Sequence, residues 1–408
     1  MKRTIISTLV ISVLSFNVVA NSLVTDEASL QQAISRANLN AHTNVIIFSR
    51  NAKISLSGPV IYSGDQPVKL VGNGAVIDGS RAGSFVLDRD LTAVTKDGSL
   101  VFNTAADISI KNLSVVYSAT RGVVINVPES AVGDDISVKL NRVAITGSAL
   151  YGLHIDDNLD EFDDGTAGSA IGIDLKISNS MFTGNGTGAI DFDGIRVDER
   201  GDGDINALII NTKIDANGGD GIELDEGGDG HVIATMLNVS INDNGFYNPA
   251  DLDDGFDIDE SGDGDIEVQL INVTASNNKD EGLDFDEAND GSVELKLLGV
   301  VANSNTDESI KVDEEGAGDI EARLSNVTVD NAGDDGIQFT ELGEGEIEAS
   351  LSKVIATNSK KYGVNFQQWL IEDESSPVED AGELRARNIT LSGNAKGNEI
   401  KVNNIEIK

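Results

Sequence analysis

The chain has 408 residues, a formal net charge of −40 and no cysteine. The absence of cysteine excludes a disulfide framework and thiol chemistry. A negative charge of this size repels phosphate backbones and anionic lipid, so we expect neither a nucleic-acid partner nor a membrane partner. We also expect the chain to be monomeric.

Residues 1–20 have the three parts of a secretory signal peptide. A basic start, Met1-Lys2-Arg3, precedes an apolar stretch that ends on the small residues Val18-Val19-Ala20. A membrane anchor is the alternative, but polar residues interrupt the stretch, which falls short of the ~20 apolar residues that a span needs. The sequence therefore predicts an exported protein, secreted or periplasmic.

Residues 21–44 form an N-terminal segment with one short helix. Leu30, Ala33, Ile34 and Ala37 make a single apolar stripe at helical spacing. We expect this amphipathic helix to cap the open apolar end of the structure that follows.

From Gly194 onward one pattern occurs six times, with departures such as Ser309 and Thr340. It reads Gly, apolar, any residue, apolar, Asp, Glu, then a glycine-rich turn and an alternating apolar run that in several copies ends on Asn-Val. The copies start 27, 34, 27, 27 and 27 residues apart, and a repeat of this length predicts a stacked solenoid. Each copy contains two runs of alternating pattern and no helical spacing, so each copy is one coil of a parallel β-helix. We expect an all-β fold, with residues 45–408 forming roughly ten coils.

Several segments together resemble a known family. They are the secretion signal, Leu30-Gln-Gln-Ala-Ile-Ser-Arg-Ala37, Val71-Gly-Asn-Gly-Ala-Val-Ile-Asp-Gly79 and the coils that carry Asn-Val before a turn. This arrangement resembles the pectin-lyase-like right-handed parallel β-helix proteins, and the whole chain is similar to exported polysaccharide-lyase-like proteins of bacterial biofilm matrix clusters. The resemblance implies a right-handed β-helix, calcium that neutralises a sugar carboxylate, and Lys, Arg or His as the base. No catalytic motif of the family matches residue by residue.

Strand alternation places the third and fifth residues of each repeated segment on the outside, where stacking makes two files. The first file contains His154, Arg196, Glu223, Asp257 and Asp284 and continues to Lys311, Gln338 and Asn365. The second is aspartate from Asp156 through Asp313.

Neighbouring carboxylates in such a file, about 4.8 Å apart, repel by roughly 3.5 kcal/mol at an effective dielectric constant of 20. Protons or cations must therefore accompany them, and Ca²⁺ suits a flexible set of oxygen ligands. The alternative is a solvated acidic face that keeps the protein soluble. The expected metal ligands are Asp198, Glu223, Asp225, Asp257, Asp259, Asp284 and Asp286.

The files change character at their N-terminal end, where His154 and Arg196 occupy positions that later coils fill with acids. Tyr151 precedes this segment and Tyr247 lies on a protruding loop. β-Elimination of a uronate needs a neutralising cation, a base and an acid. The expected catalytic residues are therefore His154, Arg196, Tyr151 and Tyr247, with His154 and Arg196 adjacent if the insertion at 157–170 adds no coil.

The sequence thus predicts an exported, calcium-assisted polysaccharide lyase that acts on an acidic polysaccharide. One alternative is a non-catalytic, calcium-loaded matrix or glycan-binding protein. The other is a glycoside hydrolase of the same fold, which Asp253-Asp254 permits but which lacks the accompanying Gly-His-Gly and Arg-Ile-Lys segments. A recurring asparagine before each bend predicts an internal amide ladder, made of Asn179, Asn211, Asn238, Asn272 and Asn326.

Overall fold

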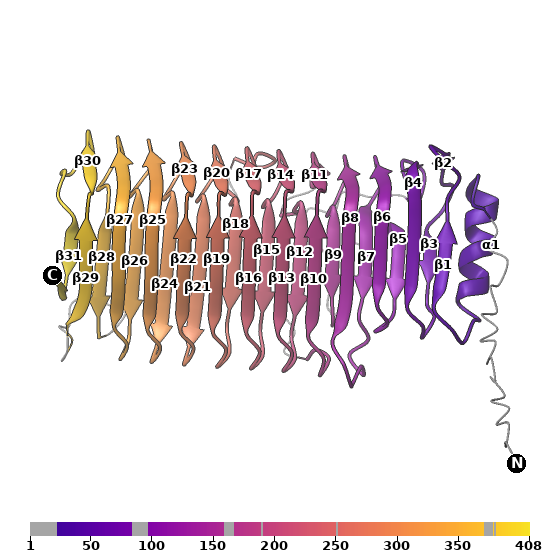
Figure 1. Cartoon of the computed structure of the whole chain (residues 1–408), viewed down its shortest axis with the longest axis horizontal. Helices are drawn as coiled ribbons and strands as arrows, with labels where there is room; N and C mark the ends of the chain where they lie inside the picture. Colours follow the sequence, from indigo (N-terminus) through magenta and orange to yellow (C-terminus); the bar gives the residue numbers. More distant parts are fainter. Residues whose placement is uncertain are drawn as a thin grey trace, which may run out of the picture.

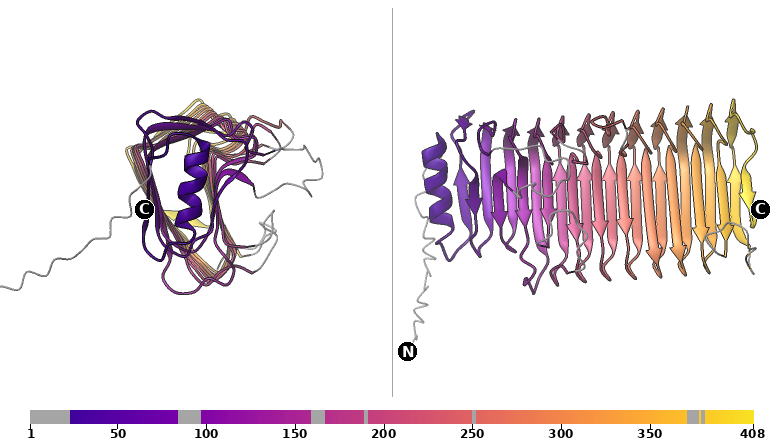
Figure 2. Two further views of the ribbon diagram at one scale, coloured as in Figure 1. Left: turned by 90° about the vertical axis from the view of Figure 1, so that its right-hand side faces the viewer. Right: turned by 180° about the vertical axis from the view of Figure 1, so that it is seen from behind.

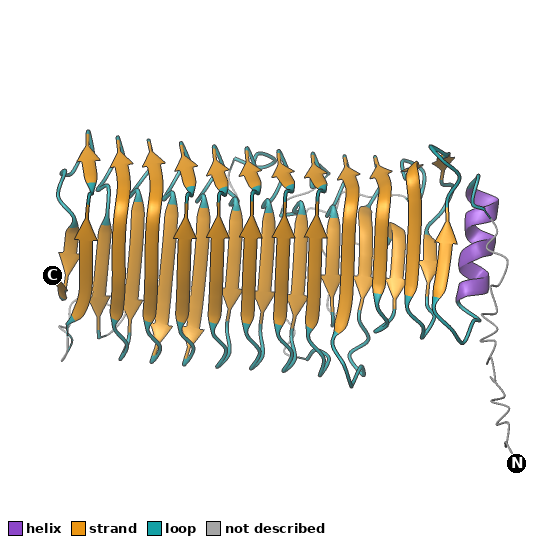
Figure 3. Cartoon of the chain, viewed as in Figure 1, coloured by secondary structure: helices purple, strands orange, loops and turns teal. Residues whose placement is uncertain are grey.

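The computed structural model describes residues 23–83, 97–158, 167–188, 191–249, 252–370, 378 and 381–408. Within these residues the chain forms one helix and thirty-two strands, stacked in a single row from the N-terminal end to the C-terminal end (Figure 1; Figure 3). The predicted signal peptide, residues 1–20, lies outside the described residues. No helix in the described part of the chain is both long and apolar enough to cross a membrane.

The strands belong to two sheets, and the pairings between successive coils are parallel. The 12-stranded sheet contains β3 (Val60–Tyr62), β5 (Gly98–Asn103), β7 (Arg121–Asn126), β9 (Leu153–Asp156), β12 (Ile195–Glu199), β15 (Ile222–Glu226), β18 (Phe256–Glu260), β21 (Leu283–Asn289), β24 (Ile310–Gly316), β26 (Ile337–Leu342), β28 (Asn365–Trp369) and β31 (Lys401–Asn403). The 20-stranded sheet contains β1 (Asn44–Ile47), β2 (Lys53–Ser55), β4 (Val68–Asp78), β6 (Ile108–Val116), β8 (Ile136–Thr146), β10 (Ile173–Ser178), β11 (Met181–Thr183), β13 (Ile205–Ile210), β14 (Lys213–Asp215), β16 (Val232–Leu237), β17 (Ser240–Asn242), β19 (Ile266–Ile271), β20 (Thr274–Ser276), β22 (Val293–Leu298), β23 (Val301–Asn303), β25 (Ile320–Asp330), β27 (Ile347–Thr357), β29 (Gly382–Arg387), β30 (Thr390–Ser392) and β32 (Ile405–Ile407).

The coil is right-handed. In Figure 1 the 20-stranded sheet lies in front with its strands pointing up, the 12-stranded sheet lies behind with its strands pointing down, and the chain advances from right to left. This confirms the predicted right-handed parallel β-helix. The 12-stranded sheet supplies one strand per coil within the described residues, whereas the sequence analysis expected roughly ten coils. The earlier coils lack the repeated segment that begins with Gly and ends with Glu, by which the later coils could be counted in the sequence.

The predicted capping helix is α1 (Glu27–Ala37). Its N-cap, Asp26, accepts a hydrogen bond from the backbone N–H of Ser29 at 2.8 Å. Leu30, Ile34 and Ala37 are buried against the first coil, and the end-on view shows α1 lying across the stack (Figure 2, left). The helix thus covers apolar surface that a further coil would otherwise cover.

The predicted asparagine ladder is exposed rather than internal, which corrects the sequence analysis. Its members have positive φ angles, such as 54° at Asn238, because they form the bends where asparagine tolerates left-handed backbone. Their amides still join coil to coil, for example Asn238 Nδ2 to Asn211 Oδ1 at 3.0 Å. A second ladder lies inside, at most 2% exposed, and was not predicted; it contains Asn185, Asn217, Asn244, Asn278 and Asn305.

Candidate active site and metal centre

The two predicted files form on the outer face of the 12-stranded sheet. β9 pairs with β12 so that His154 lies opposite Arg196 and Asp156 opposite Asp198. The insertion at 157–170 therefore adds no coil between them. The later members also follow the predicted register, with Glu223 opposite Asp257.

The central part of this face is buried, although its side chains point away from the main core. His154 and Asp198 are each 2% exposed, Glu223 is 6% exposed and Arg196 is 9% exposed. Asp257 and Asp259 are half-buried. The alternative of an open, solvated acidic face therefore does not describe these coils.

An ion-pair network connects the predicted base to its neighbours. His154 Nε2 lies 2.7 Å from Asp198 Oδ2, and Arg196 Nε donates to the other oxygen of Asp198 at 2.6 Å. Arg196 also pairs with Glu223 and, at 3.1 Å, with Asp225. Burial alone would lower the pKa of Arg196, but Asp198 and Glu223 hold it well above its usual value. Arg196 is thus a permanent cation that binds the chain's own carboxylates.

Tyr151 packs directly on His154. The two rings are stacked with centroids 4.6 Å apart, and Phe192 meets Tyr151 edge-on at 4.7 Å. Burial raises the pKa of Tyr151 well above its usual value. Its hydroxyl therefore stays protonated at neutral pH, as a proton donor must.

Tyr247 belongs to a different part of the face. Its hydroxyl donates to the carbonyl of Gly188 at 3.1 Å, and the N–H of Gly188 donates to Ala149 at 2.7 Å. Tyr247 therefore ties the loop before β18 to the segment that precedes Tyr151, rather than contacting His154 directly.

Several predicted metal ligands are paired with cations of the chain itself. Asp225 accepts from Arg200 Nη1 at 2.8 Å as well as from Arg196. Lys311 binds Asp284 at 2.8 Å and Asp286 at 3.2 Å. The expected repulsion along the files is thus relieved in part by Arg196 and Lys311 of the first file and by Arg200, which the strand pattern did not place there.

A third acidic file, missed by the sequence analysis, lies beside the first two. Its members directly precede the first residue of each repeat, so the repeated sequence itself indicated this file. One oxygen of each of its four aspartates accepts a backbone N–H of the next coil, as in Asp193 Oδ1 with Asp220 N at 2.8 Å. The file consists of Asp193, Asp220, Asp254, Glu281, Glu308 and Asp335.

The best candidate metal centre combines this third file with the first. Carboxylate oxygens of Asp191, Asp193, Asp220 and Glu223 all lie within 4.8 Å of one another. Asp193 is fully buried, and among the described residues its Oδ2 has no hydrogen-bond partner. Burial, followed by the charge of Glu223, raises the pKa of Asp193 well above its usual value. A cation bound by these oxygens would remove both the repulsion and the orphaned acceptor.

Further groups of the same kind continue along the face. Glu223, Asp257 and Asp259 form one, and Asp254, Asp257 and Asp284 form another. Burial, then Asp225, raises the pKa of Asp259 to about 6. Glu223, Asp257, Asp259 and Asp284 are therefore the predicted ligands that the structure groups with other carboxylates.

The last residue of each repeated segment points inward and forms a glutamate ladder. Glu287, for example, accepts from the N–H of Gly291 at 3.0 Å, while its buried Oε2 has no hydrogen-bond donor in the part of the chain that the structure describes. Successive rungs are in register, ending on Gln368, whose amide accepts from Ile347 N–H and donates to Gly345. The acidic rungs are Glu199, Glu226, Glu260, Glu287, Glu314 and Glu341.

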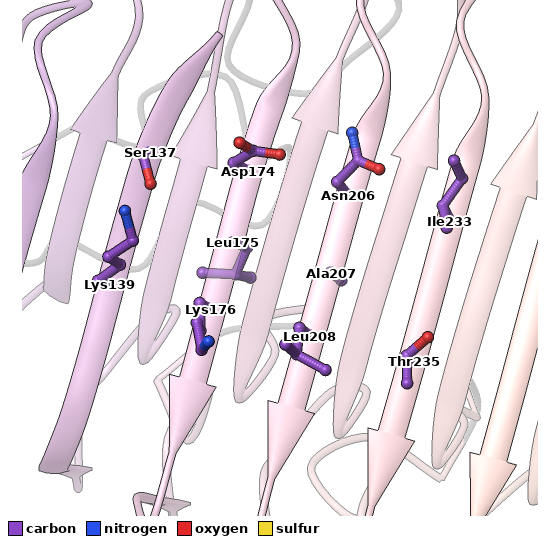
Figure 4. Close-up of a pocket in the computed structure, with 10 residues that line it drawn as sticks. All are labelled: Ser137, Lys139, Asp174, Leu175, Lys176, Asn206, Ala207, Leu208, Ile233 and Thr235. Atoms are coloured by element: carbon purple, nitrogen blue, oxygen red, sulfur yellow. The ribbon is translucent and has the colours of Figure 1, made fainter.

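A hollow of about 340 Å³ lies on the opposite side of the molecule, on β8, β10, β13 and β16 of the 20-stranded sheet (Figure 4). Lys139 of β8 and Lys176 of β10 are among the residues that line it. None of the predicted site residues lines this hollow. We therefore place the candidate site on the 12-stranded sheet.

Solved structures of polysaccharide-modifying enzymes are similar to this chain. Periplasmic alginate epimerase AlgG is 13% identical over 94% of this chain and 89% of its own, with a TM-score of 0.43. The A-module of mannuronan C-5 epimerase AlgE4 from Azotobacter vinelandii is 14% identical over 95% and 96%, with a TM-score of 0.43. The catalytic unit of a GH87 alpha-1,3-glucanase from Streptomyces thermodiastaticus is 11% identical over 92% and 61%, with a TM-score of 0.39.

These likenesses concern the fold. No protein-family model matches the chain, and no curated protein matches it. The assignment as a parallel β-helix stands on the strand register of the chain itself.

Proposed function

We propose that the chain is an exported carbohydrate-active enzyme, a calcium-assisted polysaccharide lyase that cleaves an acidic extracellular or biofilm-matrix polysaccharide by β-elimination. The observation that supports this most directly is the placement of His154 against Arg196, one coil apart, on the face that also carries the four-carboxylate cluster. The proposal agrees with the resemblance to polysaccharide-lyase-like proteins of biofilm matrix clusters, of which rugosity and biofilm structure modulator B is one.

β-Elimination removes the C5 proton of a uronate, forms a C4–C5 double bond and expels the glycosidic oxygen at C4. His154 is the base: its Nε2 is held by Asp198, so Nδ1 is the atom that accepts the proton. Arg196 stabilises the negative charge that develops on the sugar carboxylate. Tyr151, kept protonated by burial, donates to the leaving oxygen, and Tyr247 is the alternative donor from the neighbouring loop.

The residues present fit a calcium ion at Asp191, Asp193, Asp220 and Glu223. These four side chains offer hard oxygen ligands, and the buried Oδ2 of Asp193 needs a positive partner. When bound, calcium neutralises a sugar carboxylate and so makes the adjacent C5 proton more acidic. The proposed site keeps Glu223 from the predicted set, although Glu223 also pairs with Arg196, and adds Asp191, Asp193 and Asp220.

The requirement for calcium tests this proposal. The viscosity of an acidic exopolysaccharide should fall when the protein is added with millimolar calcium and should stay constant in excess EDTA. Calcium, but not magnesium at matched ionic strength, should restore the fall. Full depolymerising activity in EDTA would contradict calcium assistance.

A non-catalytic glycan-binding protein is the second candidate function. It is favoured by the burial of His154 and Arg196 and by their pairing with the chain's own carboxylates. In that case the protein would bind the acidic polysaccharide through calcium and leave its viscosity unreduced. The same viscosity experiment therefore separates the two candidates.

A further inference from the structure

The outer face of the 12-stranded sheet changes its chemistry near the C-terminal end. Asn365 of β28 lies opposite Lys401 of β31, and Gln367 lies opposite Asn403. The positions that are acidic in the middle coils are thus amides and a lysine here. A pocket of about 460 Å³ opens at this point, within the range of small-ligand sites.

Asn365 presents an unsatisfied acceptor at this pocket. Its side-chain Nδ2 donates to Asp335 Oδ2 at 2.8 Å, which fixes the orientation of the amide. Its Oδ1 is buried and has no hydrogen-bond donor in the described part of the chain, and the residue is only 7% exposed. An unpaired buried acceptor costs free energy, which a hydroxyl donor from a ligand would recover.

Three lysines line the same pocket, Lys361, Lys396 and Lys401. Lys361 pairs with Asp334 at 2.5 Å, whereas the ammonium of Lys401 donates to Asn403 Oδ1 at 2.7 Å. An ammonium has three N–H donors, so Lys401 retains donors for a ligand. The same lining also contains Glu308, Asp313 and Asp335, so Lys396 and Lys401 are cations of a pocket of mixed charge.

We propose that this C-terminal pocket is a subsite for one uronate residue of an acidic polysaccharide. Lys396 and Lys401 bind the sugar carboxylate, and Asn365 accepts a hydrogen bond from a sugar hydroxyl. The proposal deepens the proposed function, on which it rests for the polymer class. Seven coils separate β28 from β9, which is about 34 Å along the axis, so a short oligosaccharide fills the pocket without reaching His154.

Calorimetric titration of the full chain with uronate trisaccharides tests the proposal. The probes are galacturonate and mannuronate trimers, with maltotriose as the uncharged control, all in EDTA so that metal does not mediate binding. The pocket variant is Lys396→Gln with Lys401→Gln. The matched control is Lys139→Gln with Lys176→Gln, which makes the same charge change on the opposite sheet.

We expect a uronate trimer to bind the wild-type chain and the control variant with equal affinity. The pocket variant should bind it at least about tenfold more weakly, because the loss of a hydrogen bond to a charged group lowers affinity by about that factor or more. Asn365→Ser should also weaken binding, and thermal unfolding of this variant checks that the chain still folds without the hydrogen bond to Asp335. Equal affinity of wild type and pocket variant, tight binding of maltotriose, or no binding of either trimer would each overturn the subsite. Formation of unsaturated product, measured separately, reports on the lyase proposal, so the two can fail independently.

Discussion

At the scale of single residues, the environment of His154 determines its proposed role. Asp198 binds one ring nitrogen at 2.7 Å, and Tyr151 stacks on the ring plane. Together they fix the tautomer and the orientation of the imidazole, as the carboxylate partner of a catalytic histidine does. A purely structural histidine would depend on the same contacts, so a test must separate fold from turnover.

His154→Gln makes that separation. Glutamine keeps an N–H that can donate to Asp198 but cannot accept a proton at neutral pH, so turnover should fall by roughly 10² to 10⁴. The melting temperature should change by only a few degrees, and Lys69→Ala, an exposed change on β4, should affect neither quantity. Near-normal turnover in His154→Gln would remove His154 from the mechanism. Depolymerisation rate and thermal unfolding are the measurements.

Asp193 is the residue whose substitution tests the proposed metal centre. Asp193→Asn retains an oxygen for the N–H of Asp220 but removes one charge from the four-carboxylate cluster. Calcium affinity should fall at least about tenfold, whereas the calcium-free protein should be as stable or more so, because like-charge repulsion is relieved. The exposed turn variant Asp202→Asn is the control. An unchanged calcium affinity by titration calorimetry would move the site to Glu223, Asp257 and Asp259.

At the scale of elements, stacked ladders of side chains hold the coils in register. The ladders differ in the hydrogen-bond donors that they need. The internal asparagine ladder satisfies itself, since each amide both accepts and donates along the axis. The glutamate ladder satisfies itself only when it holds protons, because an ionised carboxylate lacks a donor. Its terminal rung, Gln368, shows that a neutral amide fits the same position.

The glutamate ladder predicts a stability that falls with rising pH. Burial, together with the charges of adjoining glutamates, raises the pKa of Glu287 and Glu314 to about 8, and burial raises that of Glu341 to about 8. A raised pKa in the folded state means that the native chain holds these protons more tightly than the unfolded chain. The associated stability is complete below the ordinary pKa near 4.5 and is lost as pH rises through about 8.

Glu314→Gln tests this pH dependence. It should reduce the loss of melting temperature between pH 5 and 9 and make the protein more stable than wild type at pH 9. The exposed variant Glu321→Gln, on β25, controls for net charge. Identical pH profiles for Glu314→Gln and wild type would show that the ladder does not hold protons in this range.

The two asparagine ladders should differ in sensitivity. Asn244→Ala leaves the buried backbone N–H of Asn217 without its acceptor and removes one of the two donors to Asn278 Oδ1, so it should cost at least about 2 kcal/mol in the free energy of unfolding. Asn238→Gly, in the exposed ladder, retains the positive φ and should cost less. Chemical denaturation measures both. Equal costs would contradict the distinction between an internal and an exposed ladder.

The strand pattern was sufficient to predict the coil, the capping helix and the register of His154 with Arg196. Alternation fixes which side of the sheet a residue takes, so the acidic files followed directly. Alternation does not fix what covers that side of the sheet, or the direction in which the long side chains bend. The burial of Asp198 and the pairing of Arg200 with Asp225 were therefore not predicted. The acid that precedes each repeat, as in Asp220, was visible in the sequence but was not recognised as a third file.

At the scale of the whole molecule, one long face carries acids in its middle coils and lysines and amides toward its C-terminal end. Acidic clusters loaded with calcium and a lysine-lined pocket can both bind carboxylates of one polymer lying along the coil axis. The net charge of −40 opposes the approach of such a polymer in the absence of calcium. Under the proposed function, we therefore expect the encounter with an acidic polysaccharide to depend on calcium.

The most direct test of the lyase proposal is the chemistry of the products. The full chain is incubated with a panel of acidic exopolysaccharides and calcium while ultraviolet absorbance of unsaturated uronate and the number of reducing ends are followed together. β-Elimination predicts that both rise in proportion, one double bond for each new reducing end. Reducing ends without unsaturated product would show hydrolysis instead, and a rise in neither, with the polymer bound, would contradict catalysis.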